Sequence, residues 1–303
     1  MRHTLIRILL VIIFGAIVTG GVLLFNNFNA IEAHELRFEN RVIVSEGRDR
    51  VYMLGVPSQQ TYEPVPLLVV LHGGGSSAED VQERTDFETA YRVLKKPVAI
   101  AYPEGTPDRP EDDHNVWNAE RCCDIALEED ISDAEFLSAV VTDIANIIPI
   151  RSVSVVGFSN GAMMATHWAC HPESPVDFMI SVDGGVKVLE NCERRDWSGI
   201  FFGFNNELKP IPEGGTTIHK NLFTSPEGGG WDTTRFQCQQ SQGGEHRTRT
   251  QLIEVSGYYD CAGGSFKEIW NLSDEHAWPT FSLWSEVRNT YESFEEWVWH
   301  SVP

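Results

Sequence analysis

The sequence predicts an α/β fold, in which a mainly parallel central sheet is covered by helices on both faces. Three observations carry this prediction. Short apolar runs typical of buried strands recur along the chain, segments with helical periodicity separate most of them, and no internal repeat or low-complexity block interrupts the series. The 303 residues, 42% hydrophobic and 22% charged, are enough to bury a full core. We expect a single domain over residues 31–303.

The chain begins with a segment of a different kind. Residues 8–25 contain only apolar side chains, glycine and one threonine, and Arg2 and Arg7 precede them. This run exceeds the apolar core of a secretory signal, roughly 7 to 15 residues, and matches the about 17 to 25 residues of a membrane-spanning helix. Residues 1–30 are therefore expected to form a signal anchor, with a cleaved signal peptide as the alternative. The arginines should stay in the cytoplasm, which places residues 31–303 in the periplasm or outside the cell.

Strand candidates follow in regular order. The segment Arg41–Val56 has the pattern of an antiparallel lead-in. The apolar candidates after it are Leu67–Leu71, Pro97–Tyr102, Val153–Val156, Phe178–Val182, Ile200–Phe204 and Phe266–Leu272. Because the loops at the carboxyl ends of such strands form the cleft of an open α/β sheet, catalytic side chains are expected there.

Two stripes of apolar residues have helical spacing. Between residues 134 and 148 they recur at three- and four-residue steps, and Pro149 ends the pattern. A second stripe predicts a C-terminal helix and contains Trp284, Val287, Tyr291, Phe294 and Val298. Both stripes are interpreted as core-facing sides of helices rather than as lipid or cofactor contacts.

A Gly-x-Ser-x-Gly sequence at Gly157–Gly161 stands between a strand candidate and a helix-like run, Ala162–Cys170. In this setting the sequence forms a nucleophile elbow, a sharp turn that lifts the hydroxyl of Ser159 above the sheet. The two glycines leave room for the turn. The alternative is a plain strand-to-helix turn, because small residues around a serine also occur by chance.

A glycine loop, His72–Gly75, follows an earlier strand candidate. Backbone amides of such a loop can approach a substrate closely and stabilise the negative oxygen of a tetrahedral intermediate. We expect the oxyanion hole to consist of the Asn160 amide together with Gly74 or Gly75. Nucleotide binding is not indicated, since neither Gly-Lys-Ser/Thr nor Gly-x-Gly-x-x-Gly spacing is present.

His276 follows the last strand candidate, in the stretch Asp274–Pro279. A serine first and a histidine late, with an acid between them, is the chain order of an α/β-hydrolase. His276 is therefore the expected general base. Trp278 is expected to fix the histidine loop or to contact the substrate.

These motifs occur in an order that resembles the polyhydroxybutyrate depolymerase and feruloyl esterase group of secreted α/β-hydrolases. The segments that carry the resemblance are Arg50–Pro57, Leu71–Gly75, Tyr102–Gly105, Trp117–Asn118, Cys122–Cys123, Asp133–Phe136, Gly157–Gly161 and His276–Pro279. The resemblance implies a serine esterase that acts on ester bonds outside the cytoplasm and needs no metal or organic cofactor.

The acid of the triad departs from this group's pattern. Its members usually carry His-Gly-Thr-x-Asp, whereas this chain reads Phe202–Asn206, with Asn206 where the aspartate is expected. Asparagine can hold the wrong histidine tautomer, and in a serine protease that exchange lowers turnover about 10⁴-fold. Two acids remain as candidates: Glu207, the next residue, which we rank slightly ahead, and Asp183, at the end of the strand candidate Phe178–Val182.

The long loop Asp108–Ala126 contains Trp117. Its indole is expected either to pack against a substrate ring or polyester chain, or to anchor the loop. The sequence leaves both alternatives open.

All six cysteines lie beyond the apolar N-terminal segment, in a compartment that should permit disulfides. The favoured pairs are Cys170 with Cys192 and Cys238 with Cys261. Cys122 and Cys123 either pair with each other or stay free. Zinc is not indicated, because no Cys-x-x-Cys or His-Glu-x-x-His spacing is present.

The chain is acidic, with a formal net charge of −21. Such a surface repels nucleic acid and anionic lipid headgroups, so no nucleic-acid partner is expected, and contact with a membrane is expected only through the N-terminal segment.

The sequence therefore predicts serine-dependent hydrolysis of carboxylic esters, polymeric or small. Ser159 attacks the ester carbonyl, and His276 takes its proton and delivers it to the leaving alcohol. The alternative, from another class, is a catalytically weak or inactive hydrolase fold kept as a membrane-tethered binding protein, because the family aspartate is missing.

Overall fold

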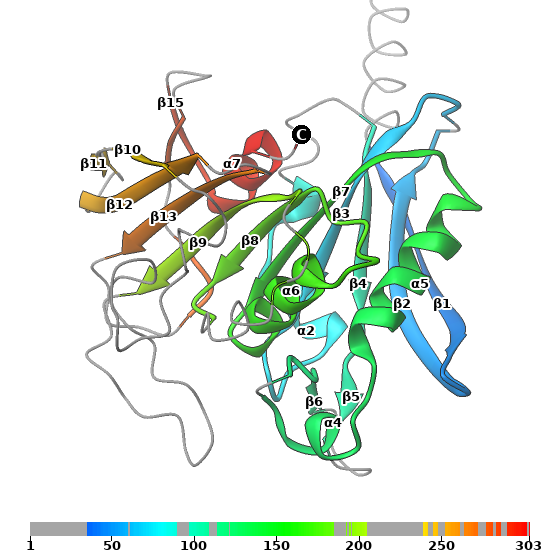
Figure 1. Cartoon of the computed structure of the whole chain (residues 1–303). Coiled ribbons are helices and arrows are strands. Elements are labelled where there is room, and N and C mark those ends of the chain that lie inside the picture. The colour runs from blue at the N-terminus through cyan, green and yellow to red at the C-terminus, as the bar shows by residue number, and fades with distance from the viewer. Residues whose placement is uncertain are drawn as a thin grey trace, which may run out of the picture.

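The structure is a computed structural model of the chain (Figure 1). It describes residues 35–59, 61–89, 97–108, 114–120, 122–184, 192, 194, 196–204, 239–241, 245–247, 252–260, 264–271, 277–280, 283–285, 290–301 and 303. The expected membrane segment, residues 1–30, lies outside this part of the chain and stays a prediction. Among the described residues, no helix has the length and apolar character needed to cross a membrane.

A large mixed sheet forms the centre of the molecule (Figure 1). Its strands run in the spatial order β1-β2-β4-β3-β7-β8-β9-β13-β12-β10, and β11 pairs with β12. Their bounds are β1 (Leu36–Ser45), β2 (Arg48–Pro57), β3 (Val65–Leu71), β4 (Ala99–Pro103), β7 (Ile150–Phe158), β8 (Phe178–Val182), β9 (Ser198–Phe204), β10 (Gln239–Ser241), β11 (Glu245–Arg247), β12 (Leu252–Asp260) and β13 (Ser265–Asn271).

The middle of the sheet is parallel and its margins are antiparallel. Neighbouring strands from β4 through β3, β7, β8 and β9 to β13 pair in parallel. The β1–β2 hairpin and the strands β12 and β10 add antiparallel pairs at the two sides. The mainly parallel sheet and the antiparallel lead-in are therefore confirmed.

Burial of the central strands explains their composition. All seven residues of β3 and all five of β4 are buried, so both faces of these strands are covered and the usual alternation with polar residues is absent. Side chains of β3 alternate between two cores, with Leu67 and Val69 in one and Leu68 and Val70 in the other.

Helices cover both faces of the sheet. The described helices are α2 (Ala78–Arg84), α4 (Asp124–Glu128), α5 (Asp133–Ala145), α6 (Asn160–Cys170) and α7 (Phe294–Ser301). Leu137 of α5 and Trp168 of α6 belong to one core, and Val81 of α2 and Trp297 of α7 belong to the other. The predicted helical cover on both faces is therefore confirmed.

The C-terminal helix is shorter than the apolar stripe predicts. Residues 283–285 and 290–292 form a two-stranded ribbon, β14 (Leu283–Ser285) and β15 (Thr290–Glu292), in which Trp284 and Tyr291 are direct partners. The helix begins only at Phe294, because Ser293 and Glu296 form a capping box: Ser293 Oγ accepts from the Glu296 amide at 3.2 Å, and Glu296 Oε2 accepts from the Ser293 amide at 3.0 Å. The prediction of one helix from Trp284 onward is wrong.

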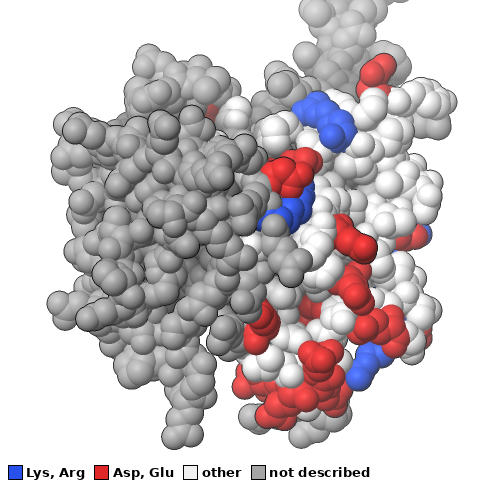
Figure 2. Space-filling view, viewed as in Figure 1, with Lys and Arg blue, Asp and Glu red and all other residues white. Residues whose placement is uncertain are grey.

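A smaller ribbon, β5 (Thr106–Pro107) with β6 (Asn115–Val116), lies near α4. On the face shown in Figure 2, acidic side chains gather over the part of the molecule that carries these elements. The exposed residues around the end of α4 include Glu128, Glu129 and Asp130. This agrees with the acidic character of the whole chain.

Candidate active site

Ser159 occupies the turn between β7 and α6. Its backbone lies at φ 54° and ψ −120°, in a region that residues with a Cβ rarely adopt. The Ser159 amide donates to the carbonyl of Val182 at 2.9 Å, which ties the turn to the end of β8. The Ser159 carbonyl accepts from the amides of Ala162 and Met163, each at 3.0 Å, and so starts α6.

The two glycines of the motif are required by close backbone contacts. A Cβ on Gly157 would overlap the carbonyl oxygen of Gly161, and a Cβ on Gly161 would overlap the carbonyl oxygen of His72. Neither neighbour is a flexible side chain, so neither can move away cheaply. The strand, sharp turn and helix expected of a nucleophile elbow are therefore present.

The glycine loop after β3 lies beside this turn. A Cβ placed on Gly73 would be 3.5 Å from Cβ of Ser159, and one on Gly74 would be 3.4 Å from Cβ of Asn160. No acceptor for the Gly74 amide is found in the described part of the chain. Gly74 and the first amides of α6 therefore lie side by side, as an oxyanion hole requires.

The structure corrects one oxyanion candidate. The amide of Gly75, at φ 72°, donates to the carbonyl of Asn115 at 3.0 Å and joins the loop to β6. An amide engaged in this way is not available to a substrate oxygen. Between the two glycines that the sequence proposes, only Gly74 remains.

His72 holds the glycine loop from inside the protein. Its side chain is completely buried, and Nε2 accepts from the Gly105 amide at 3.0 Å. Because Gly105 can only donate, the proton must be on Nδ1, which donates to the Gly73 carbonyl at 2.7 Å. The approach of Glu104 to within 3.5 Å of Nε2 is therefore not an ion pair. Burial lowers the pKa of His72 to about 4, so the imidazole is neutral at pH 7.

The side chain of Asn160 is fixed by the backbone of Trp117. Asn160 Oδ1 accepts from the Trp117 amide at 2.8 Å, and Nδ2 donates to the Trp117 carbonyl at 3.1 Å. Asn160 is 4% exposed. These two bonds orient the first residue of α6, and with it the backbone amide next to Ser159.

The environment of the Trp117 side chain distinguishes between the two roles expected for it, substrate contact and loop anchor. The side chain is fully buried, its Nε1 donates to the His72 carbonyl at 3.0 Å, and its ring centroid lies 4.9 Å from that of His72. A side chain enclosed in this way cannot contact a substrate. Trp117 anchors the loop, and its assignment as a substrate-binding residue is wrong.

A buried ion pair supports the same loop, and sequence reasoning missed it. Arg50 of β2 contacts Asp133 of α5 with 2.7 Å between Nη2 and Oδ1, and the Asn118 amide donates to Asp133 Oδ2 at 2.7 Å. The Arg50 guanidinium also lies 4.0 Å from the ring centre of Phe136. Burial raises the pKa of the Asp133 carboxyl, while the charge of Arg50 opposes this effect. Arg50 and Asp133 are 83 residues apart, so no local pattern indicates the pair.

Ser159 opens into a cavity of about 330 Å³. The glycine loop and the end of β7 form one part of its wall, and α2 forms another. The segment 277–278, directly after His276, also lines this cavity. The residues around it are Gly73, Gly74, Gly75, Ser76, Asp80, Val81, Arg84, Thr85, Phe158, Ser159, Ala277 and Trp278.

Trp278 is held firmly in the wall of this cavity. Its Nε1 donates to Glu295 Oε1 of α7 at 2.9 Å. Its ring meets those of Phe158 and Phe294 edge to face, with centroid separations of 6.4 Å and 5.4 Å. The tryptophan after the expected base is therefore packed against the residue that precedes Ser159. His276 itself lies outside the described residues.

Of the two candidate acids, the structure describes Asp183. It directly follows β8, is 2% exposed and has φ 55°. Its amide donates to the carbonyl of Phe202 at 2.7 Å. Because the Ser159 amide bonds to Val182, Asp183 lies at the same edge of the sheet, one strand from the serine. Asn206 and Glu207 follow the end of β9 and lie outside the described residues.

Two cysteine pairs fall in the described part of the chain. The sulfur atoms of Cys170, at the end of α6, and Cys192 lie 1.99 Å apart, in the pairing that the sequence favours. Cys122 and Cys123 are paired with each other. The second favoured pair, Cys238 with Cys261, lies outside the described residues.

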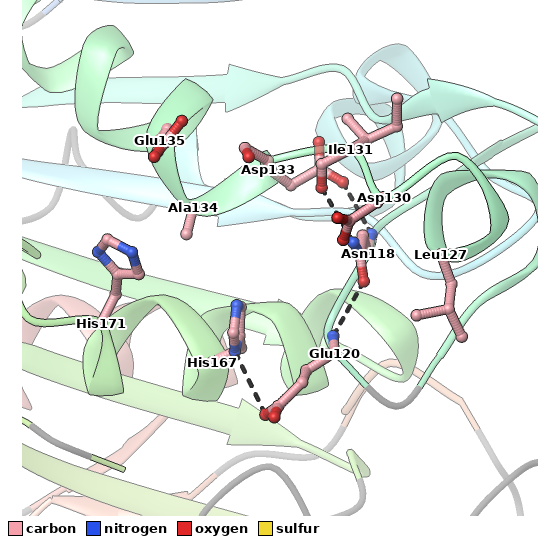
Figure 3. Close-up of a pocket in the computed structure, with 11 residues that line it drawn as sticks. Asn118, Glu120, Leu127, Asp130, Ile131, Asp133, Ala134, Glu135, His167 and His171 are labelled. Atoms are coloured by element: carbon pink, nitrogen blue, oxygen red, sulfur yellow. Dashed lines mark hydrogen bonds and ion pairs between the residues drawn. The ribbon is translucent and has the colours of Figure 1, made fainter. Parts of the chain in front are cut away.

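A second cavity, of about 220 Å³, lies along α6 and shares no lining residue with the first (Figure 3). His167 of α6 and His171, the residue directly after this helix, project into it, and Glu120 approaches His167 with 3.9 Å between Oε2 and Nδ1. Burial lowers the pKa of His167, and the charge of Glu120 opposes this. Within the described residues, no group of three or more His, Cys, Asp or Glu side chains is arranged to hold a metal ion.

Similarity to known proteins is found in part of the sequence and in the fold. No family model matches the chain. The esterase-like protein NocK of Nocardia uniformis subsp. tsuyamanensis is 33% identical over a match 141 residues long, which covers 44% of this chain and 38% of that protein. The match thus spans well under half of the relative's length.

Solved structures give the fold. An IroE-like serine hydrolase from Shewanella oneidensis is 12% identical, covers 88% of this chain with 78% of its own, and has a TM-score of 0.51. A ferulic acid esterase is 13% identical, with coverage of 57% of this chain and 80% of that chain and a TM-score of 0.42. The strand order, the parallel centre of the sheet and the hydrolase that spans most of the chain together show that this protein has the α/β-hydrolase fold.

Proposed function

We propose that this protein hydrolyses carboxylic esters, with Ser159 as the nucleophile and His276 as the general base. The observation that carries the proposal is the geometry of Ser159. It sits at φ 54° between two sterically required glycines, next to a glycine loop and open to a cavity. Residues held in such a backbone conformation concentrate at functional sites, because the surrounding structure must compensate for the strain.

The reaction proceeds through an acyl-enzyme. Ser159 Oγ attacks the ester carbonyl while His276 accepts the hydroxyl proton, and the same proton then passes to the departing alcohol. Water next attacks the acyl group with His276 again as base, which releases the carboxylic acid and restores the serine. No metal or organic cofactor takes part in these steps.

The oxyanion is stabilised by backbone amides of Asn160 and Gly74. Gly74 is preferred to Gly75 because the Gly75 amide is already bonded to Asn115. His72 and Trp117 keep the two donors in place through the Gly73 carbonyl and the Asn160 side chain. Such preorganised donors contribute about 10² to 10³ in turnover each.

Two observations support the role of His276. Ala277, its neighbour in the chain, lines the cavity of Ser159, and Trp278 is fixed to Glu295 and packed against Phe158. Trp278 therefore fixes the segment after the base, and it also presents part of its ring to a bound substrate. The acid that orients His276 is Glu207 or Asp183, both of which follow strands that end at the same edge of the sheet.

The proposed substrates are esters of the polyester, feruloyl or acetyl type. They follow from the resemblance of the ordered motifs to the polyhydroxybutyrate depolymerase and feruloyl esterase group. The N-terminal segment 1–30 places the catalytic domain outside the cytoplasm, either anchored to the membrane or released.

The test is hydrolysis of 4-nitrophenyl acetate by the full chain and by Ser159→Ala. The variant should lose activity by at least about 10³-fold, as expected when a triad nucleophile is removed. Ser132→Ala, at the start of α5, is the matched control and should retain activity. Equal hydrolysis by wild type and Ser159→Ala would show that the mechanism is wrong.

A second candidate function is motivated by Asn206, which stands where the related group has its aspartate. In this case the protein is a membrane-tethered binding protein with weak or no catalysis. Failure of Ser159 to react with a fluorophosphonate probe, together with tight binding of a polyester or glycan, would favour this candidate over the esterase.

A further inference from the structure

Among the described residues that line the cavity of Ser159, Arg84 is the single cationic side chain. It is the last residue of α2 and is exposed. No carboxylate in the described part of the chain lies within 4.0 Å of its guanidinium, and the guanidinium donates no hydrogen bond to a residue of that part. An unpaired arginine is unusual here, because the chain has 44 acidic and only 23 basic residues.

In the part of the cavity wall that the structure describes, the only acidic side chain is Asp80, one helical turn before Arg84. Asp80 already has a partner, since Ser76 Oγ donates to its Oδ2 at 3.2 Å. Arg84 is therefore the charged group of this wall that is left to meet a ligand. The wall also contains Phe158 and Trp278, so a ligand would find an apolar surface together with one positive charge.

We propose that Arg84 binds a carboxylate of the substrate, so that the preferred substrates are esters that also carry a free carboxylate in their acyl or alcohol part. This inference rests on the proposed esterase function. A guanidinium is always charged and offers a planar set of N–H donors that matches a carboxylate in bidentate geometry. Half-esters of dicarboxylic acids and the acid ends of polyester chains have this chemistry.

A singly charged carboxylate fits better than a phosphate. A phosphate monoester carries a charge of about −1.5 to −2 at pH 7, and Asp80 in the same wall repels the second charge. The overall acidity of the chain disfavours anions of either kind, so a local cation is needed to bring an anionic ester to Ser159.

The experiment compares two esters of the same shape, mono-4-nitrophenyl adipate, which carries a carboxylate, and 4-nitrophenyl 6-methylheptanoate, which is neutral. The readout is the ratio of kcat/KM for the anionic ester to that for the neutral ester, measured with the full chain. Arg84→Gln should lower this ratio about tenfold or more, because a charge-assisted contact is lost. Arg84→Lys should retain part of the preference, since it keeps the charge without the planar geometry.

Two further variants sharpen the result. Asp80→Asn should raise the ratio, because it removes the negative charge from the same wall. Arg48→Gln is the matched control: Arg48 is exposed, pairs with Glu129 at 3.1 Å and does not line the cavity, so the ratio should stay at its wild-type value. Added salt should reduce the ratio for the wild type more than for Arg84→Gln.

The outcomes separate this inference from the proposed function. If Ser159→Ala abolishes hydrolysis of both esters but Arg84→Gln leaves the ratio within twofold of wild type, the carboxylate assignment is wrong and the esterase stands. If Ser159→Ala hydrolyses both esters like the wild type, the serine mechanism itself is wrong.

Discussion

Asn160 and Trp117 are joined by two hydrogen bonds between the Asn160 side chain and the Trp117 backbone, at 2.8 Å and 3.1 Å. One residue starts the helix after Ser159, and the other lies in the loop after β6. The contact therefore connects the proposed oxyanion donor to a buried tryptophan, which in turn bonds to the carbonyl of His72. The elbow, the glycine loop and the Trp117 loop form one connected unit.

Replacing Asn160 with Ala should damage this unit. The variant leaves the buried Trp117 amide without its acceptor and removes the hydrogen bond to the Trp117 carbonyl. This loss lowers the free energy of unfolding by about 1 to 3 kcal/mol. The fall in kcat should exceed what this loss of stability explains, because the backbone amide of residue 160 is no longer oriented. Urea unfolding and 4-nitrophenyl ester kinetics check both effects. Asn146→Ala, at the exposed end of α5, is the control, and equal kcat values for the two variants would contradict the role given to Asn160.

Protonation of His72 should destabilise the fold in acid. Its pKa is about 4 in the folded protein and about 6.5 when unfolded, so the unfolded chain binds a proton first. The stability that depends on neutral His72 is complete above pH 6.5 and is lost as the pH falls toward 4, by up to about 3 kcal/mol.

The measurement is the free energy of unfolding in urea at several pH values between 7 and 4, for wild type and His72→Gln. The glutamine can still donate a hydrogen bond but does not titrate, so its stability should fall less steeply over this range. Parallel curves for the two proteins would show that His72 does not titrate as described.

The Arg50–Asp133 pair should matter far more than an exposed pair. Asp133→Asn leaves the buried charge of Arg50 without its counterion, and such a loss costs about 3 to 5 kcal/mol. Glu129→Gln removes the exposed partner of Arg48 and should cost less than about 1 kcal/mol. Urea unfolding of the two variants checks the contrast. Similar losses would mean that the buried pair contributes no more than a surface contact.

Replacing the two candidate acids one at a time should identify the third member of the triad. Asp183→Asn and Glu207→Gln keep size and polarity but remove the negative charge that orients His276. The variant that removes the acid of the triad should have a kcat lower by up to about 10⁴-fold, as in a serine protease with the same exchange. The other variant should have a kcat close to that of the wild type. The measurement is kcat for a 4-nitrophenyl ester at neutral pH, with the fold checked by circular dichroism. A small effect from both variants would remove both acids from the mechanism.

Features that depend on short-range patterns can be predicted from the sequence. Uninterrupted apolar runs predict β3 and the other parallel strands, because a strand buried on both faces has no polar side. The glycines around Ser159 predict the elbow, because the turn has no room for a Cβ at either place. The chain order of Ser159 and His276 predicts which loops meet at one edge of the sheet.

Which groups already have hydrogen-bond partners becomes visible in the folded protein. It shows that the Gly75 amide is bonded to Asn115, that Trp117 is enclosed, and that Arg84 lines the cavity without a partner among the described residues. Each of these facts depends on contacts between residues far apart in the chain, which no local pattern records. The ribbon in which Trp284 pairs with Tyr291 has a different, local cause: cross-strand pairing outweighed an apolar spacing that also suits a helix.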